Sequence, residues 1–475
     1  MEFIEIDYDK HNPSSIEAYA QKLVGMSFRE VWENDQKKEK DLFLLEEDEN
    51  SDDAENKKNK GNLGQLIEES FFHYECNSDS GPDFREAGVE LKVTPYRLNR
   101  NGSIVAKERL ILTMIDYFSV VNEEFETSHF WTKCRLILLV YYLYQPEISF
   151  RLDYRIKYTK LFSPPAQDLA IIKHDYEFIV NKIRMGKAHE LSEGDTLYLG
   201  AAPKAATGAV RRAQPFSKEM AKPRAFAFKS SYMTYVLNTY IVPGKQTYEP
   251  IIVDNIQDSF EDYVVTKINH YRGARVEDLC HEFEIDNAKK PKNLEAMIAY
   301  RILGIKGNHA EEFEKANVVV KTIRIEKNGK IRENMSFPAF KFRELINETW
   351  ENSTFGNYLR ETRFLFVVYK YDEDDSLRLR GCQFWNIPYD DLECEVREVW
   401  ERTVHVLKEG LKITIINGKK YNNFPKASEN RVSHVRPHAL NADDTYELPD
   451  GRLYPKQCFW LNNSYVLSQL KDDLR

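Results

Sequence analysis

The sequence predicts a mixed α/β protein built from two similar domains in tandem. Its 475 residues exceed the size at which one hydrophobic core keeps growing, so two domains of about 200 residues each are expected. Apolar runs typical of strands alternate with segments of helical apolar spacing. Three segments of the first half also recur in the second half, in the same order and at nearly one spacing.

The elements of the first half follow from local patterns. Ser14 or Ser15 can cap an amphipathic helix over residues 16–32, and Asn101-Gly102 has the form of a hairpin turn. The other expected elements are a helix at 63–72, a strand within 83–95, a buried strand at 135–144 and a helix at 173–191. We therefore expect a first domain at residues 1–240.

The internal repeat defines the rest of the chain. Residues 88–93 resemble 317–322, residues 135–141 resemble 363–369, and residues 224–237 resemble 457–470. Each match is weak alone, because apolar strands resemble one another, but their common order favours a duplication. We expect a small helical connector at 241–284 and a second domain at 285–475.

Composition restricts the function less than the net charge suggests. The net charge of −9 is unusual for a nucleic-acid-binding protein, but seven carboxylates lie between Glu46 and Glu55 in one solvated segment. The six cysteines form no CxxC pair, which argues against zinc and favours reduced thiols. No apolar run is long enough to span a bilayer, so a cytoplasmic protein is expected.

A carboxylate-rich strand is the main candidate for catalysis. Pro82-Asp83, six further residues and then Glu90-x-Lys92 have the form of the PD-(D/E)xK nuclease motif. Glu90 and Lys92 project to one face of the strand, because side chains alternate. Asp83, Glu90 and the Leu91 carbonyl could hold Mg²⁺ through oxygen ligands, and Lys92 could orient the attacking water. The alternative is a strand with one solvated face.

Only the first repeat carries this set of residues. Glu90 corresponds to Val319 in the second repeat, although Lys92 is matched by Lys321. Asp83 falls opposite Glu312, and a further carboxylate on the preceding helix, Glu68, falls near Tyr300. We therefore expect one catalytic half and one half that has lost its metal ligands.

A basic segment follows the predicted strands of the first half. Residues 204–229 hold one acid, Glu219, and seven basic residues: Lys204, Arg211, Arg212, Lys218, Lys222, Arg224 and Lys229. Such a segment is typical of contacts to DNA phosphates and grooves, although a solvated basic loop is the alternative.

The ordered motifs in residues 59–72, 83–95 and 125–133 resemble the MutH mismatch-repair nicking endonucleases. The chain resembles still more closely the Sau-type restriction endonucleases that cut at GATC, through "KERL", "GKAHELSEG" and "KSSYMT" in the first half and "MSFPAFKF", "ETRFLF" and "HVRPH" in the second. The resemblance implies a restriction-endonuclease-like fold, duplicated as a pseudo-dimer with a catalytic N-terminal half and an inactive, DNA-binding C-terminal half. It also implies Mg²⁺-dependent cleavage of duplex DNA 5′ of the G in GATC, leaving 5′-phosphate ends.

The resemblance also assigns roles within the motif residues. It makes Asp83, Glu90 and Lys92 the catalytic triad, Glu68 the helix carboxylate, and Lys133 a lysine that positions the backbone phosphate. His129, near Lys133, is expected to be structural.

DNA-reading residues are expected at one matching place in each half. Pro203 and Lys204 keep the MutH pattern, but Ala202 stands where MutH has arginine. In the second half Arg436 takes the arginine position, His438 lies opposite Lys204, and Trp460 stands where the first half has Ala227. Arg436 is the best candidate for reading a base, because arginine can grip a guanine edge with two hydrogen bonds.

Three functions stay open at this stage. A type II restriction endonuclease is the leading one, with a cognate DNA methyltransferase as partner and a chain that is monomeric in solution and dimerises transiently on DNA. A MutH-like nicking endonuclease of mismatch repair is the second. A DNA-binding protein without activity is the third, and Asp83, Glu90 and Lys92 together argue against it.

Overall fold

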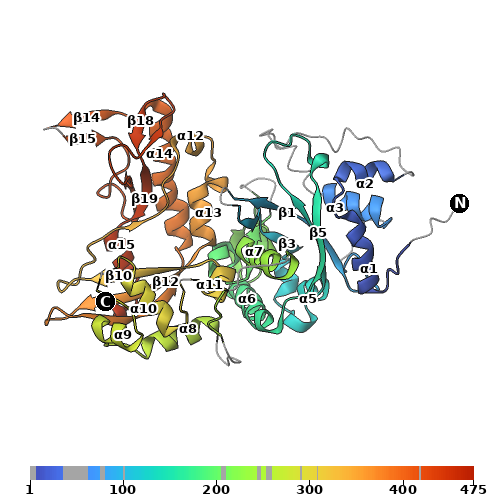
Figure 1. Ribbon diagram of the computed structural model, residues 1–475, viewed down its shortest axis with the longest axis horizontal. Coiled ribbons are helices and arrows are strands. Elements are labelled where there is room, and N and C mark those ends of the chain that lie inside the picture. Colours follow the sequence, from blue (N-terminus) through green and yellow to red (C-terminus); the bar gives the residue numbers. More distant parts are fainter. Residues whose placement is uncertain are drawn as a thin grey trace. The chain divides into compact units, whose positions relative to one another are not determined.

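The computed structural model describes residues 7–35, 62–74, 81–99, 102–204, 210–242, 248–252, 259–288, 291–307, 309–416 and 419–475. The protein is mixed α/β and divides into two compact units (Figure 1). Unit 1 comprises Met1–Tyr248 with Glu314–Ala316, and unit 2 comprises Glu249–Phe313 with Asn317–Arg475. The acidic segment between Glu46 and Glu55 lies outside the described residues. Within the described ranges, no helix is long and apolar enough to cross a bilayer.

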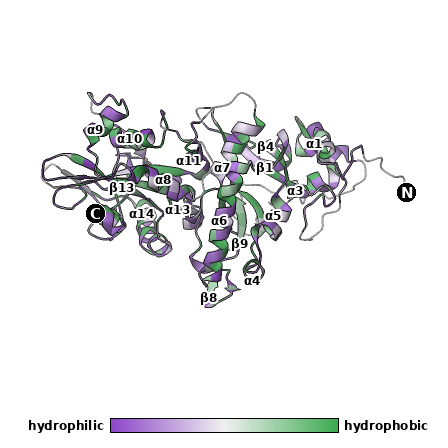
Figure 2. Ribbon diagram, turned by 90° about the horizontal axis from the view of Figure 1, so that it is seen from below, coloured by the Kyte–Doolittle hydropathy of each residue, from purple (hydrophilic) through white to green (hydrophobic). Residues whose placement is uncertain are grey.

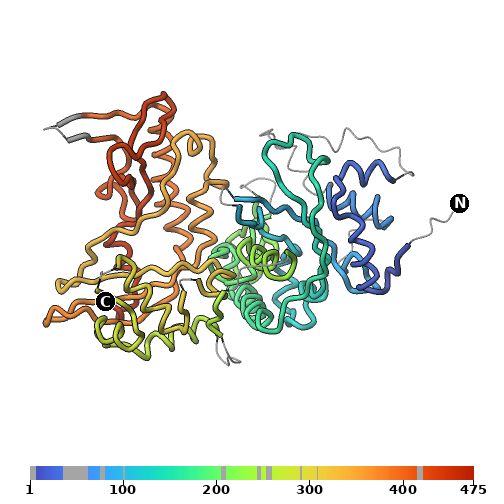
Figure 3. The backbone as a smooth tube through the Cα atoms, in the orientation of Figure 1, coloured from blue at the N-terminus to red at the C-terminus, as the bar shows by residue number. Residues whose placement is uncertain are grey.

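Unit 1 contains a four-stranded sheet in the order β2-β1-β4-β5. Its strands are β1 (Glu90–Leu98), β2 (Ile104–Ala106), β4 (Ile137–Leu143) and β5 (Ile156–Phe162). β1 runs parallel to β4, and the other neighbours are antiparallel. The N-terminal helices, blue in Figure 3, cover one face of this sheet and bury Val89 and Leu91 of the β1 region. Glu90 and Lys92 therefore project from the opposite face.

The helices on that face are short because of particular residues. The single helix expected over residues 16–32 is interrupted between α1 (Pro13–Ala20) and α2 (Phe28–Asn34). Gly25 has φ 96°, a conformation that other residues rarely adopt, and Ser27 with Glu30 forms a capping box that starts α2. The first helix is capped by Asn12 rather than by Ser14 or Ser15.

A second sheet, in the order β3-β9-β6, completes unit 1 with further helices. The strands are β3 (Leu110–Met114), β6 (Leu199–Pro203) and β9 (Arg224–Phe228), and β7 (Arg212–Gln214) with β8 (Ser217–Ala221) forms a separate hairpin. The helices are α3 (Asn62–Leu66), α4 (Tyr117–Val120), α5 (His129–Cys134), α6 (Ala166–Arg184) and α7 (Ser230–Val236). The short 3-10 or π turns are η1 (Gln21–Leu23), η4 (Ile67–Phe71), η5 (Phe125–Thr127), η6 (Arg151–Asp153), η7 (Ala188–Glu190), η8 (Glu193–Asp195) and η9 (Leu237–Ile241).

Unit 2 contains sheets in the orders β10-β12-β13 and β11-β19-β16. Its strands are β10 (Val318–Ile325), β11 (Met335–Ser336), β12 (Arg363–Tyr371), β13 (Leu377–Trp385), β14 (Ile413–Ile416), β15 (Lys419–Asn422), β16 (Ser433–Pro437), β17 (Thr445–Glu447), β18 (Leu453–Pro455) and β19 (Gln457–Leu461). Its helices are α8 (Phe260–Asn269), α9 (Val276–Glu282), α10 (Leu294–Ile302), α11 (Glu311–Ala316, whose last three residues belong to unit 1), α12 (Phe342–Leu345), α13 (Thr354–Glu361), α14 (Arg397–Glu409) and α15 (Asn463–Ser468). Its short turns are η10 (Trp350–Asn352), η11 (Asp391–Val396) and η12 (Asp472–Leu474).

The expected connector contains helices α8 and α9, and both belong to unit 2. Asn269 at the end of α8 accepts the Cys382 N–H of β13 at 3.2 Å, and Glu261 pairs with Arg363 of β12 at 2.8 Å. These contacts fix α8 to the unit 2 sheet.

Both units contain the same strand arrangement. β10 runs parallel to β12 and β12 antiparallel to β13, as β1, β4 and β5 do in unit 1. Glu90 lies opposite Ile137, and Val319 opposite Phe364, so β4 corresponds to β12 one residue earlier than the sequence match suggested. The one-residue difference matters because it decides which face each side chain occupies.

Side-chain hydrogen bonds repeat as well. Ser128 caps α5 and Ser353 caps α13, and both hydroxyls also donate to the carbonyl three residues earlier. The Tyr232 hydroxyl donates to Asp168, and the Tyr465 hydroxyl donates to Asp391 in unit 2. The two units therefore share buried polar contacts as well as strand order.

Candidate active site

The candidate site forms where β1 begins. The Leu91 N–H donates to Asp83 Oδ2 at 2.8 Å, which ties the Asp83 loop to the strand. The Glu90 N–H donates toward β4, to the Leu136 carbonyl at 3.0 Å. Because backbone groups alternate along a strand, the Leu91 N–H and carbonyl point to the opposite edge, toward Asp83. The motif spacing thus brings Asp83 beside the Leu91 main chain.

Glu90 is the buried centre of the site. Its side chain is 1% exposed, and its Oε1 atom accepts a hydrogen bond from Lys92 Nζ at 2.5 Å. Lys133 Nζ lies 3.4 Å from the same oxygen. Glu90 Oε2 is buried and has no hydrogen-bond partner among the described residues. A buried carboxylate oxygen without a partner is costly, so this atom is where a ligand is expected.

The charges of the site are strongly coupled. Burial raises the pKa of Glu90, and Asp83 raises it further, whereas Lys92 and Lys133 lower it. Burial lowers the pKa of Lys92, but the charge and hydrogen bond of Glu90 outweigh burial, so the pKa of Lys92 is raised. Lys92 therefore keeps its proton at neutral pH and can act as a hydrogen-bond donor and positive charge.

Helix α5 supplies the second lysine. The Ser128 cap starts α5, and Lys133 lies in its last turn with a side chain 17% exposed. The neighbouring Cys134 was not predicted to be near the site. Its thiol is buried and is influenced by Lys92, Glu90, Lys133 and Asp83, and burial raises its pKa to about 12. Cys134 is therefore a neutral thiol that packs against the charged cluster.

Glu68 and His129 lie on neighbouring elements. Glu68 is half-buried on the π turn η4, directly after α3, which packs on β1. Among the described residues, Glu90 is contacted by Lys92 and Lys133 rather than by Glu68. His129 Nδ1 lies 3.4 Å from Thr113 Oγ1 of β3, and the His129 N–H donates to Glu123. His129 thus contacts β3 at the start of α5.

The corresponding place in unit 2 has a lysine without a carboxylate. Lys321 of β10 lies 3.5 Å from the Ser336 carbonyl and near the Phe337 ring, and burial lowers its pKa. Glu312 is buried and accepts the N–H groups of Ile251 and Ile252, so it holds the main chain of this unit. Tyr300, expected near the Glu68 position, packs against Phe313.

The predicted basic residues of unit 1 separate into two groups. Lys204, Arg211 and Arg212 are exposed, and Lys222 is half-buried. Arg224 and Lys229 are each 4% exposed. Arg224 donates to the carbonyls of Ala201 (2.5 Å) and Leu191, and Lys229 donates to the carbonyl of Thr196. Their positions do not suit the DNA contact expected from the sequence, because strand β9 and the start of α7 are interior elements.

The predicted unit 2 recognition residues lie together. The Arg436 guanidinium is 5.2 Å from the centre of the Trp460 ring, and the Trp460 indole donates to the Arg436 carbonyl at 3.3 Å. The His438 ring is 5.8 Å from the Trp460 ring, and Arg436 and His438 are both exposed. Buried His434, which the sequence analysis missed, stacks on Trp460 at 6.4 Å. Its position two residues before Arg436 in β16 places both on one face of the strand.

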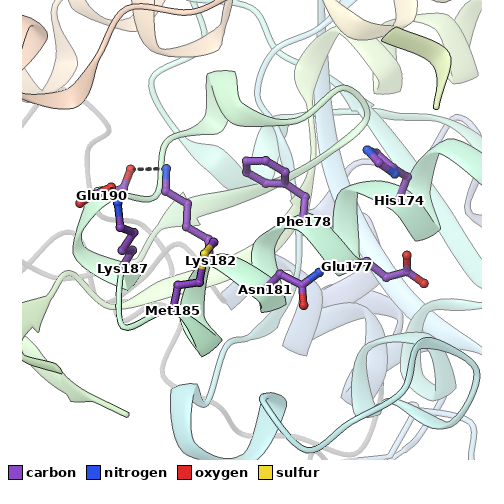
Figure 4. A pocket seen from close by; sticks show the side chains of 8 residues that line it. All are labelled: His174, Glu177, Phe178, Asn181, Lys182, Met185, Lys187 and Glu190. Carbon is purple, nitrogen blue, oxygen red and sulfur yellow. Dashed lines mark hydrogen bonds and ion pairs between the residues drawn. The ribbon is translucent and has the colours of Figure 1, made fainter. Parts of the chain in front are cut away.

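A separate hollow lies along α6 (Figure 4). Phe178, Lys182 and Met185 line it, and Lys182 donates to the Glu190 carbonyl at 2.9 Å. None of the residues predicted for catalysis or DNA binding lines this hollow.

A divalent metal ion would suit the atoms at the start of β1. Glu90 Oε2, the Asp83 carboxylate and the Leu91 carbonyl are hard oxygen donors of the kind that Mg²⁺ prefers. No group of three or more His, Cys, Asp or Glu side chains in the described ranges is arranged to hold a metal ion. A metal ion here would therefore complete its shell with the main-chain carbonyl and water, as Mg²⁺ commonly does.

Comparisons with known proteins agree with this arrangement. The family described as "DNA mismatch repair enzyme MutH" matches residues 72–175 and again residues 303–393, so one family matches both units. MutH proteins from Shewanella woodyi and Vibrio campbellii are 28% and 29% identical over 187 and 188 residues, which is 38% of this chain and 78% and 79% of theirs.

The similarity to one restriction enzyme extends along most of the chain. The type II restriction enzyme Sau3AI of Staphylococcus aureus is 38% identical over 462 residues, covering 88% of this chain and 93% of the relative. The duplicated strand arrangement, the carboxylate–lysine site and this long alignment lead to one assignment. The chain belongs to the MutH-like family of type II restriction enzymes that includes Sau3AI.

Proposed function

We propose that the chain is a type II restriction endonuclease that cuts duplex DNA at GATC, 5′ of the G, and leaves 5′-phosphate ends. The observation that carries the proposal is buried Glu90, which holds two lysines on one oxygen and leaves the other oxygen without a partner. Such a carboxylate serves no evident folding purpose, because two buried lysines and an unpaired oxygen must be compensated. It suits a site that handles phosphate and metal.

The catalytic set in this proposal is Asp83, Glu90, Lys92, Glu68 and Lys133. Asp83, Glu90 and the Leu91 carbonyl would hold Mg²⁺. When bound, Mg²⁺ lowers the pKa of a bound water and neutralises charge on the scissile phosphate. Lys92 keeps its proton because of Glu90, so it donates to a non-bridging phosphate oxygen or to the attacking water. Lys133, close to the same oxygen, positions the phosphate.

The two halves would have different tasks. We place cleavage in residues 1–240 and DNA binding without cleavage in residues 285–475, as a pseudo-dimer within one chain. The shared strand order and repeated hydrogen bonds support common ancestry, and Val319 with Lys321 supports the loss of metal binding. Arg436 over Trp460, beside His438, supports base reading by the second half.

In the cell, the proposal implies a bacterial cytoplasmic enzyme with a cognate DNA methyltransferase. The chain would be monomeric in solution and would dimerise transiently on DNA.

One incubation tests the proposal against its rivals. Purified protein, plasmid DNA and Mg²⁺ are combined, and the ends are mapped by sequencing. Double-strand cuts before the G of GATC, with 5′ phosphates, support the restriction enzyme. Nicks on one strand support a MutH-like repair endonuclease, which the MutH relatives keep in consideration. Intact DNA with a gel shift supports a DNA-binding protein without activity.

A further inference from the structure

The hairpin formed by β7 and β8 has an unusual surface for an exposed element. Residues 210–222 hold one acid, Glu219, and four basic residues: Arg211, Arg212, Lys218 and Lys222. The same segment exposes three large apolar side chains: Val210 (41% exposed), Phe216 (74%) and Met220 (49%). Apolar side chains gathered among cations are typical of a surface that binds a polyanion with apolar parts.

Phe216 lies at the tip of this hairpin in an unfavourable conformation. Gln214 pairs with Ser217, so Pro215 and Phe216 form a two-residue turn. Proline fixes φ near −65°, and Phe216 has φ 63°, which is the pattern of a type II turn. That position ordinarily holds glycine, because a side chain is strained there. The fold gains little from the phenyl ring, since most of the ring is in solvent. Strain of this kind at an exposed tip indicates a function.

The base of the hairpin is held firmly, so the tip has a defined position. Gln214 is 4% exposed, accepts the Ala188 N–H at 2.7 Å and donates to the Glu219 carbonyl at 2.7 Å. The main chain of Phe216 lies close against Gly186, where an added Cβ would be 2.7 Å from the Phe216 carbonyl oxygen. Figure 2 shows β8 beyond the lower end of α6. The backbone of Phe216 is thus anchored while its ring projects.

We propose that Phe216 is an apolar wedge that inserts between neighbouring base pairs of the bound DNA, with Arg211, Arg212 and Lys218 on the flanking phosphates. The inference rests on the proposed function in that the ligand is duplex DNA. Phenylalanine is one of the side chains that unstack a base step, and basic neighbours supply the phosphate contacts that hold a hairpin in a groove. A held turn is suited to this task, because a mobile tip would lose entropy on insertion.

The test compares Phe216→Gly with the wild type and with the control Phe150→Ala, an exposed phenylalanine elsewhere in unit 1 (46% exposed). Glycine accepts the positive φ of this turn without strain, so the melting temperature of Phe216→Gly stays the same or rises. Duplex affinity is measured by fluorescence anisotropy. Base unstacking is measured with the fluorescent adenine analogue 2-aminopurine at successive positions in and beside GATC.

The wild type and Phe150→Ala are expected to raise 2-aminopurine fluorescence at one base step. Phe216→Gly should lose this rise and bind roughly tenfold more weakly, as expected for a lost base–aromatic contact. Equal affinity and an equal fluorescence rise for Phe216→Gly would overturn the wedge, even if both proteins cut GATC. So would the absence of any rise with the wild type. If Phe216→Gly instead abolishes self-association and leaves DNA affinity intact, the hairpin binds a second chain and the wedge is wrong. Failure of the wild type to cut GATC would count against the proposed function only, because the binding comparison stands without cleavage.

Discussion

Two lysines from different elements converge on one oxygen of Glu90. Lys92 comes from the same strand and Lys133 from the end of α5, and their charges offset part of the cost of burying the carboxylate. Unit 2 shows the effect of losing the carboxylate. Lys321 has the place of Lys92 but faces the carbonyl of Ser336, and its pKa is lowered rather than raised. One residue, Glu90 or Val319, thus decides the charge state that each lysine prefers.

Replacing either metal-binding carboxylate should abolish cleavage and spare DNA binding. We expect Asp83→Ala and Glu90→Ala each to lose at least about 100-fold in cleavage rate, because the charge they organise is needed in the transition state. DNA affinity should stay within several-fold of wild type. Plasmid cleavage over a range of Mg²⁺ concentrations and gel shifts without metal measure the two properties. Cleavage at the wild-type rate by either variant would show that the site lies elsewhere.

The pH dependence of cleavage should report on Glu90. The reaction requires the ionised carboxylate, and burial raises its pKa, so activity should fall on acidification at a higher pH than for an ordinary glutamate. Lys133 lowers that pKa. Lys133→Met removes this positive charge, so the acid limb of the pH–rate profile should move to higher pH, by up to about one pH unit.

The matched control for the pH profile is Lys160→Met. Lys160 lies on β5, where it pairs with Glu17 at 3.2 Å, and its side chain is 49% exposed. Its removal should leave the acid limb in place. An identical profile for wild type and Lys133→Met would mean that another group controls the acid limb.

At the scale of elements, the basic segment of unit 1 contributes two different things. The β7–β8 hairpin presents Arg211 and Arg212 to solvent, whereas Arg224 on β9 is an interior residue bonded to the carbonyls of Ala201 and Leu191. A hairpin outside the sheet has no interior to fill, but a strand between β3 and β6 does. The same residue type therefore serves a ligand on one element and the fold on the other.

This difference predicts opposite phenotypes. Replacing Arg211, Arg212 and Lys222 together by alanine should weaken DNA binding and flatten the slope of log K against log salt by roughly one for each lost phosphate contact. Arg224→Ala should keep the slope but destabilise the protein by about 3 kcal/mol, because two buried carbonyls lose a charged donor. Salt titrations of binding and thermal unfolding measure the two effects. A flattened slope for Arg224→Ala would show that its guanidinium reaches DNA after all.

At the scale of the whole molecule, the repeat gives one chain two similar units with unequal chemistry. Both units keep the parallel strand pair and the buried tyrosine–aspartate bond, which hold the fold. Only unit 1 keeps the carboxylate beside the lysine. Stability constrains both copies, whereas catalysis constrains only the copy that carries it out.

A single competent centre should be visible in the kinetics. Cutting both strands then requires two chains or two successive nicks. At low protein-to-site ratio we expect a nicked plasmid intermediate, or a rate that rises more steeply than linearly with protein concentration. Val319→Glu should not add a second centre, because unit 2 still lacks counterparts of Asp83 and Glu68. Linear kinetics without a nicked intermediate would contradict this arrangement, as would faster double-strand cutting by Val319→Glu.

The sequence alone predicted the mixed α/β class, the internal repeat and the cluster at the start of β1. Those features depend on short-range patterns, namely the two-residue period of strands and the spacing of Asp83, Glu90 and Lys92, which the chain carries locally. The resemblance to restriction endonucleases added Lys133, which the fold then brings to Glu90.

Other features required the tertiary structure. A count of basic residues could not separate the interior Arg224 and Lys229 from the exposed Arg211 and Arg212, because burial depends on which strands become neighbours. The register of β12 and the placing of Cys134 beside the site depend on the same long-range pairing. The strain at Phe216 is likewise a property of the closed turn, since a backbone angle in a hairpin is imposed by the pairing of its two strands.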